Sequence, residues 1–139
     1  MVLGLFFAII KTNGREGIVK QEDILTIREL LRRRREAHQE ALWKEAERLT
    51  NAASKLGVKR IVLFGSLIRE KPGLTSDLDL LIIWDTPLGF LQRTVELYRR
   101  LQPRVPTDLL VYTPNEMEGM IDTPFIKRAL EQGKVLYEG

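Results

Sequence analysis

The sequence predicts an α/β protein in which helices pack on a small mixed β-sheet. Two observations indicate this class: short β-branched and aliphatic runs alternate with segments of helical spacing, and turn-forming residues separate the segments. The chain has 139 residues, 44% of them hydrophobic and 29% charged, which is typical of an ordinary globular domain. One compact domain is therefore expected to hold most of the chain.

The N-terminal part, residues 1–20, is predicted to be an extension that precedes a main domain of residues 21–139. Residues 2–10 are apolar, but they lack the basic flank and cleavage site of a signal peptide and are too few to cross a bilayer. Three interpretations stay open: a first strand or short helix on the core, a contact surface for a partner, or an extension added by a misplaced start codon. Residues 11–17 are predicted to form a turn or linker.

A long helix is predicted next, because residues 21–56 contain no proline or glycine and their apolar side chains recur at helical spacing. Gly57 is expected to end it. Residues 32–35 are four arginines, which we interpret as a solvated face with salt bridges to Glu29, Glu36 and Glu40; the alternative is a contact for an anion or an acidic partner. His38 is expected to be packed or to face a partner rather than to bind a metal.

The remaining elements follow from apolar runs and their turns. Residues 58–64, 78–84 and 107–112 are predicted strands, and residues 134–137 a final edge strand. Residues 66–70 are predicted to form a helical turn and residues 88–101 a helix. Thr113 and Glu116 form a capping box for a short helix, and Thr123 starts a last helix that ends at Gln132.

Composition excludes several kinds of site. Without cysteine there is no disulfide, thiolate metal site or cysteine nucleophile. The single histidine excludes a multi-histidine zinc centre and leaves little scope for a Ser-His-Asp hydrolase. A net charge of +3 permits contact with anions but does not indicate nucleic acid. We expect a cytoplasmic protein with no membrane contact and no direct nucleic-acid partner.

The residues with chemical potential lie where the predicted strands begin or end. Gly65 and Ser66 follow the first strand, where glycine lets backbone N–H groups approach a phosphate and the serine hydroxyl adds a donor. Asp77 and Asp79 open the second strand, and the strand period of two puts both carboxylates on one side. Two adjacent like charges favour a divalent cation, and magnesium is commonly held by carboxylates together with substrate phosphates.

Asp108 supplies a third carboxylate at the matching place on the third strand. If that strand lies beside the second, all three acids face one cleft next to the phosphate-binding turn. Three carboxylates around a bound polyphosphate are typical of a two-metal phosphoryl- or nucleotidyl-transfer site.

The segment Gly65-Ser66, ten further residues and then Asp77-Leu78-Asp79 resembles the signature of the polymerase-beta-like nucleotidyltransferase superfamily. More narrowly, the chain resembles the minimal nucleotidyltransferases, which are antitoxins paired with HEPN-domain toxins. The resemblance implies that Gly65 and Ser66 hold the triphosphate of ATP. It also implies that Asp77 and Asp79 bind two Mg²⁺ ions and that the third aspartate completes the catalytic metal site.

Further expectations follow from the same resemblance. Arg69 is expected to contact phosphate or the acceptor, although an ordinary surface arginine is an equal alternative. The implied activity is transfer of AMP from ATP to a tyrosine hydroxyl of a HEPN toxin, in a type VII-like toxin–antitoxin pair. Two other functions stay open: an antitoxin that inhibits only by binding, and a stand-alone enzyme acting on a small molecule or an RNA end. The expected assembly is a hetero-oligomer with the toxin or a homo-oligomer.

Overall fold

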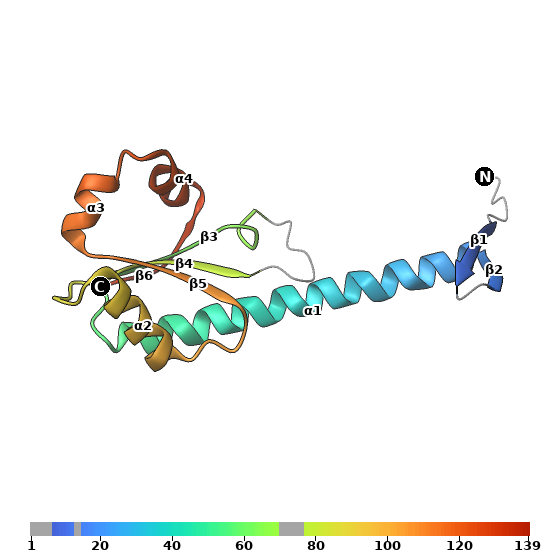
Figure 1. Cartoon of the computed structure of the whole chain (residues 1–139), viewed down its shortest axis with the longest axis horizontal. Coiled ribbons are helices and arrows are strands. Elements are labelled where there is room, and N and C mark those ends of the chain that lie inside the picture. The colour runs from blue at the N-terminus through green and yellow to red at the C-terminus, as the bar shows by residue number, and fades with distance from the viewer. Residues whose placement is uncertain (1–6, 13–14, 70–76) are drawn as a thin grey trace. The chain divides into compact units, whose positions relative to one another are not determined.

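The computed structural model describes residues 7–12, 15–69 and 77–139, with side chains from Lys20 onward (Figure 1). The chain divides into two compact units, Met1–Ala37 and His38–Gly139. This boundary lies inside the long helix α1 (Gln21–Ser54). No helix in the described part of the chain is long and apolar enough to cross a membrane.

The first unit contains an antiparallel hairpin of β1 (Phe7–Thr12) and β2 (Arg15–Lys20). Of the apolar segment, residues 7–10 therefore form strand, and they pair with β2 rather than with the main sheet. Residues 1–6 lie outside the described part. The turn predicted over residues 11–17 is too long, because pairing continues to Thr12↔Arg15; residues 13–14 are again outside the described part.

The arginine run on α1 lies on a solvated face, as predicted. Arg32 forms ion pairs with Glu29 and Glu36, at 2.5 and 3.1 Å, and Arg33 pairs with Glu29 at 3.2 Å. The expected pairing with Glu40 is wrong, because Glu40 lies one turn before Lys44 and pairs with it at 3.3 Å. Such exposed pairs at helical spacing contribute little to stability because solvent screens their charges.

The second unit is built on a four-stranded mixed sheet in the order β5-β4-β3-β6 (Figure 1). Its strands are β3 (Arg60–Phe64), β4 (Leu78–Ile83), β5 (Thr107–Tyr112) and β6 (Lys134–Glu138). β3 pairs antiparallel with β4 and β6, whereas β4 pairs parallel with β5. The predicted fold class, a small mixed sheet with packed helices, is confirmed.

Helices cover both faces of this sheet. The second half of α1 and α2 (Phe90–Leu101) pack on one face, and α3 (Pro114–Met120) and α4 (Pro124–Gln132) pack on the other. The central strands are apolar on both faces because alternate side chains point in opposite directions. On one face Leu63 and Leu80 pack with Leu42 of α1 and Leu97 of α2. On the other face the cluster is Val62, Leu81, Met117 of α3 and Ile126 of α4.

A buried arginine joins α2 to β5 and α3. Arg93 is 3% exposed, and its Nε and Nη1 donate hydrogen bonds to the carbonyls of Val111 and Leu88, at 3.1 and 3.2 Å. Its Nη2 donates to the Glu116 carboxylate. That carboxylate also accepts from the Thr113 backbone N–H at 2.8 Å, which completes the predicted capping box of α3. A charge this deeply buried requires such partners.

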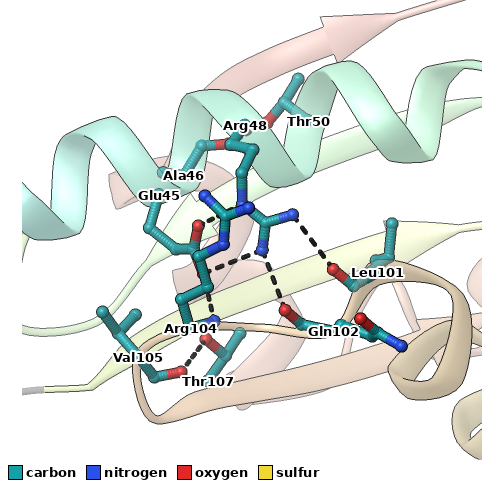
Figure 2. Close-up of polar contacts among 9 residues, drawn as sticks. All are labelled: Glu45, Ala46, Arg48, Thr50, Leu101, Gln102, Arg104, Val105 and Thr107. Atoms are coloured by element: carbon teal, nitrogen blue, oxygen red, sulfur yellow. Dashed lines mark hydrogen bonds and ion pairs between the residues drawn. The ribbon is translucent and has the colours of Figure 1, made fainter.

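A second polar network anchors the connection that leads into β5 (Figure 2). Arg48 donates from Nε and Nη2 to both oxygens of the buried Glu45 carboxylate, at 2.6 and 3.0 Å. Arg48 also donates to the carbonyls of Leu101 and Gln102, at 3.2 and 3.0 Å, and the Arg104 backbone N–H donates to Glu45. The hydrogen bond from Arg48 holds the pKa of Glu45 below its ordinary value. α1 is thereby tied to the chain between α2 and β5.

Replacing Glu45 by alanine should lower the free energy of unfolding by about 2 to 3 kcal/mol. The change leaves the Arg48 guanidinium and the Arg104 N–H without their acceptor. Urea denaturation measures the loss, and Glu47→Ala, an exposed change on the same helix, serves as the matched control. Equal stability of the two variants would contradict the structural role of the network.

Candidate active site

The turn after β3 requires glycine at position 65. Gly65 has φ +83°, and a Cβ atom placed there would lie 2.1 Å from Oδ2 of Asp79. Any side chain would therefore displace the Asp79 carboxylate as well as strain the backbone. The turn continues with a hydrogen bond from the Arg69 N–H to the Gly65 carbonyl at 3.2 Å. The Asp79 carboxylate thus lies against the backbone of this turn, and the predicted approach of a phosphate to the turn stays a prediction.

Asp79 and Asp108 are direct neighbours on adjacent strands. The parallel register pairs Asp79 of β4 with Asp108 of β5, and the antiparallel register pairs Asp79 with Phe64 of β3 on its other side. Two residues along, Leu81 packs with α3 and α4, so the strand period places the Asp79 carboxylate on that same face. The predicted adjacency of these two acids is observed.

Electrostatics at Asp79 reflect this crowding. Burial of the half-buried carboxyl raises its pKa most, and the charge of Asp108 and a hydrogen bond with it, followed by the charge of Asp77, raise it further, to about 6. The positive charge of Arg69 lowers the pKa of Asp79. The carboxylate form is thus costly in the protein alone, as expected where acidic groups gather without a cation.

Asp77 is placed less tightly. It is exposed and lies immediately before β4, yet it is close enough for its charge to raise the pKa of Asp79. Within the described residues, no three acidic or histidine side chains gather into a group that could hold a metal ion. The role of Asp77 as a ligand therefore stays a prediction, as do the roles of the other site residues.

The donor set nevertheless suits magnesium. Carboxylate oxygens are the ligands that Mg²⁺ prefers, and Mg²⁺ commonly takes one or two of them together with substrate phosphates and water. Burial raises the pKa of Asp79 most, and the charges of Asp108 and Asp77 raise it further; a bound dication would relieve that part of the shift that comes from charge repulsion. These residues therefore fit the expected metal.

Two clefts meet at Asp79. The first has a volume of about 230 Å³ and contains two arginines, Arg69 and Arg128. The second, of about 360 Å³, contains the second acid, Asp108. The wall shared by both consists of Phe64, Asp79 and Phe125, and the two rings pack edge to face with centroids 5.7 Å apart. One side of the site is thus cationic and the other acidic.

Sequence reasoning missed the contribution of α4. Phe125, Arg128, Ala129 and Gln132 all line the first cleft and recur at the three- and four-residue spacing of one helix face. The sequence carried this spacing, but a face that mixes aromatic, basic and amide side chains does not stand out as an apolar stripe. Ser66 is half-buried in the turn and is not among the residues lining this cleft.

Residues 47–139 match the family described as "Polymerase beta, Nucleotidyltransferase". The chain belongs to this family. All six predicted site residues lie in the matched range. The chain is therefore a nucleotidyltransferase, and its family implies a nucleoside triphosphate as substrate.

Relatives in this family agree with the fold and the enzyme class. The chain is 33% identical over 78 residues to "Putative protein adenylyltransferase MJ1217" of Methanocaldococcus jannaschii, covering 56% of this chain and 74% of the relative. It is 32% identical, with the same coverage, to "Putative protein adenylyltransferase MJ0126" of that organism. The fold is also similar to the crystal structure of a "putative nucleotidyltransferase from Sulfolobus solfataricus", with a TM-score of 0.56 and 19% identity. The match covers 76% of this chain and 87% of the other.

Replacing Asp79 by asparagine should stabilise the protein in EDTA at pH 7 by about 1 to 2 kcal/mol. The pKa is raised from 3.8 to about 6, so the folded state keeps a proton that the unfolded state loses, and wild-type stability falls as pH rises across this interval. Each pKa unit corresponds to about 1.4 kcal/mol, reduced here because the group is partly solvated.

Urea denaturation between pH 3.5 and 8 checks this prediction. The advantage of Asp79→Asn should shrink toward zero below about pH 4, where both states of the wild type are protonated. Asp85→Asn, an exposed change just after Trp84, is the matched control and should show no such trend. An Asp79→Asn variant less stable than wild type at pH 7 would contradict the electrostatic analysis.

Proposed function

We propose that the protein is a Mg²⁺-dependent adenylyltransferase that transfers AMP from ATP to a tyrosine hydroxyl of a partner HEPN-domain toxin, and so acts as the antitoxin of a type VII-like pair. The observation that carries the catalytic part is the pairing of Asp79 with Asp108 beside the glycine turn at Gly65. The protein acceptor is supported by the names of the two archaeal relatives. The HEPN partner rests on the sequence resemblance, and a cytoplasmic location is proposed from the cysteine-free composition.

In this proposal the first cleft receives the triphosphate. Backbone N–H groups of the Gly65–Ser66 turn donate hydrogen bonds to phosphate oxygens. The Ser66 hydroxyl lies outside the lining of this cleft, so its phosphate contact rests on the sequence resemblance alone. Arg69, from the turn after β3, and Arg128, from α4, both line this cleft and add positive charge for the β- and γ-phosphates. Family membership supports a nucleoside triphosphate here.

Asp77, Asp79 and Asp108 would hold two Mg²⁺ ions. Magnesium held there would lower the pKa of the acceptor hydroxyl and neutralise charge on the polyphosphate. The acceptor oxygen forms a bond to the α-phosphorus. The bond from that phosphorus to the oxygen that bridges the α- and β-phosphates breaks, and pyrophosphate leaves. Asp108 lines the second cleft, where it can take the proton that the acceptor hydroxyl loses.

The test is incubation of the protein with Mg²⁺, ATP labelled in the α-phosphate and the protein encoded by the neighbouring gene. Label on a tyrosine of that protein, with loss of its ribonuclease activity, is the expected result. Neutralisation without label would contradict catalysis and favour an antitoxin that acts by binding. Label transferred to a small molecule or an RNA end without any partner protein would instead indicate the stand-alone enzyme.

Asp108→Asn should lower the transfer rate by about 10³-fold or more, because the loss of one metal-binding carboxylate removes several kcal/mol of transition-state stabilisation. Its folding should be unchanged or improved, since one fewer carboxylate faces Asp79. Rate assays and thermal unfolding of the same preparation measure both, with Asp85→Asn as control. Unfolding of Asp108→Asn would show that this acid is structural.

Arg128→Ala should raise the KM for ATP about tenfold while changing the turnover number less. A charge-assisted hydrogen bond to phosphate contributes about 1.5 kcal/mol or more, which corresponds to that factor. Lys127→Ala removes a neighbouring exposed cation that is not in the cleft lining, and it should leave the KM unchanged. Equal effects of both changes would show that only the general positive charge of α4 matters.

A further inference from the structure

Tyr98 of α2 forms hydrogen bonds on both sides of Asp108. Its hydroxyl donates to the Thr107 carbonyl at 2.6 Å and accepts from the Leu109 backbone N–H at 3.0 Å. Both bonded residues are the immediate neighbours of the acid in β5. Tyr98 also lines the second cleft together with Asp79 and Asp108.

These bonds matter because β5 is an edge strand of the four-stranded sheet. The backbone groups of the even-numbered residues point toward β4. The carbonyls of Pro106, just before β5, and of Tyr112 accept hydrogen bonds from the backbone N–H groups of Leu78 and Trp84, at 3.0 and 2.9 Å. The odd-numbered residues have no strand beside them in the described sheet, and an edge without partners is easily displaced.

Side chains of α2 form hydrogen bonds with the backbone groups at this open edge of β5. The Tyr98 hydroxyl forms hydrogen bonds with the Thr107 carbonyl and the Leu109 N–H. The Nε of Arg93 donates to the Val111 carbonyl at 3.1 Å. The outer edge of β5 is therefore held at three successive odd-numbered residues. Only the two bonds from Tyr98 flank the acid directly.

We propose that Tyr98 is the positioning residue that sets the Asp108 carboxylate against Asp79, an inference that rests on the proposed function. Asp108 is itself exposed, so the position of its carboxylate depends on the backbone that carries it as well as on its hydrogen bond with Asp79. Metal-ligand carboxylates work only within narrow geometric limits, and the groups that orient them affect metal affinity or activity by about 10- to 100-fold.

The hydroxyl acts through the backbone and not on the substrate. Its single hydrogen is donated to Thr107, and it already accepts a bond from Leu109. The Tyr98 hydroxyl is thus engaged both as donor and as acceptor, and we assign it no role as acid or base. Its phenol ring remains as part of the wall of the second cleft.

Tyr98→Phe removes both bonds and keeps the ring, which makes it the direct test. We expect turnover to fall about 10- to 100-fold with the KM for ATP unchanged, and the affinity for Mn²⁺, followed by water proton relaxation, to fall about tenfold. Hydrogen exchange of the Leu109 amide should quicken severalfold. Tyr112→Phe, the same change on β5 at a hydroxyl that forms no hydrogen bond within the described part of the chain, is the control and should alter none of these.

A double-mutant cycle separates positioning from general loosening of the fold. Tyr98→Phe should weaken Mn²⁺ binding in the wild type but have no further effect in Asp108→Asn, because the acid through which it acts is gone. Additive losses in both backgrounds would overturn the proposal, and so would unchanged Leu109 exchange or unchanged Mn²⁺ affinity.

Failure of the proposed function is distinguishable from failure of this inference. If no acceptor is labelled by the wild type, the acceptor assignment fails, while Leu109 exchange and Mn²⁺ affinity still decide the role of Tyr98. If the wild type binds no Mn²⁺ even with ATP present, the metal site and the positioning role are both overturned.

Discussion

The repulsion among acidic groups at one end of the sheet is the constraint on which the rest of the structure depends. Asp79 faces Asp108 across a parallel strand pair, with Phe64 on its other side and the charge of Asp77 nearby. Folding buries Asp79 in part and brings it beside Asp108 and Asp77, and both effects, burial first, raise its pKa and make its charged form costly. The apolar runs that follow each acid, Leu80 to Ile82 and Leu109 to Val111, supply the buried surface that offsets this cost.

Holding the acids in place requires support from outside the central strands. Gly65 leaves room for the Asp79 carboxylate, and α2 supports the edge strand that carries Asp108. The bonds of Arg48 and Glu45 in turn fix the chain between α2 and β5. These residues form a chain of contacts from α1 to the site, so that a change at Glu45, far from Asp79 in sequence, bears on the strand that presents Asp108.

Local sequence signals predicted the elements that form the site. The apolar runs marked the strands, Thr113 and Glu116 marked a helix start, and the spacing of Gly65, Asp77 and Asp79 indicated the chemistry. The pairing of β4 with β5 was only a condition of that reasoning, since strand order depends on packing between distant segments. Tyr98 and Arg128 were missed for the same reason: their partners lie on other elements, and each side chain alone is ordinary on a helix surface.

The most direct measurement is isothermal titration calorimetry of Mn²⁺ into the wild-type protein saturated with a non-hydrolysable ATP analogue. If the acids form a two-metal nucleotide site, about two Mn²⁺ should bind per chain in excess of a protein-free titration of the same analogue, and this excess should vanish when Asp79 and Asp108 are both asparagine. Absence of Mn²⁺ binding in the wild type, or undiminished binding in the double variant, would contradict the assignment of these carboxylates.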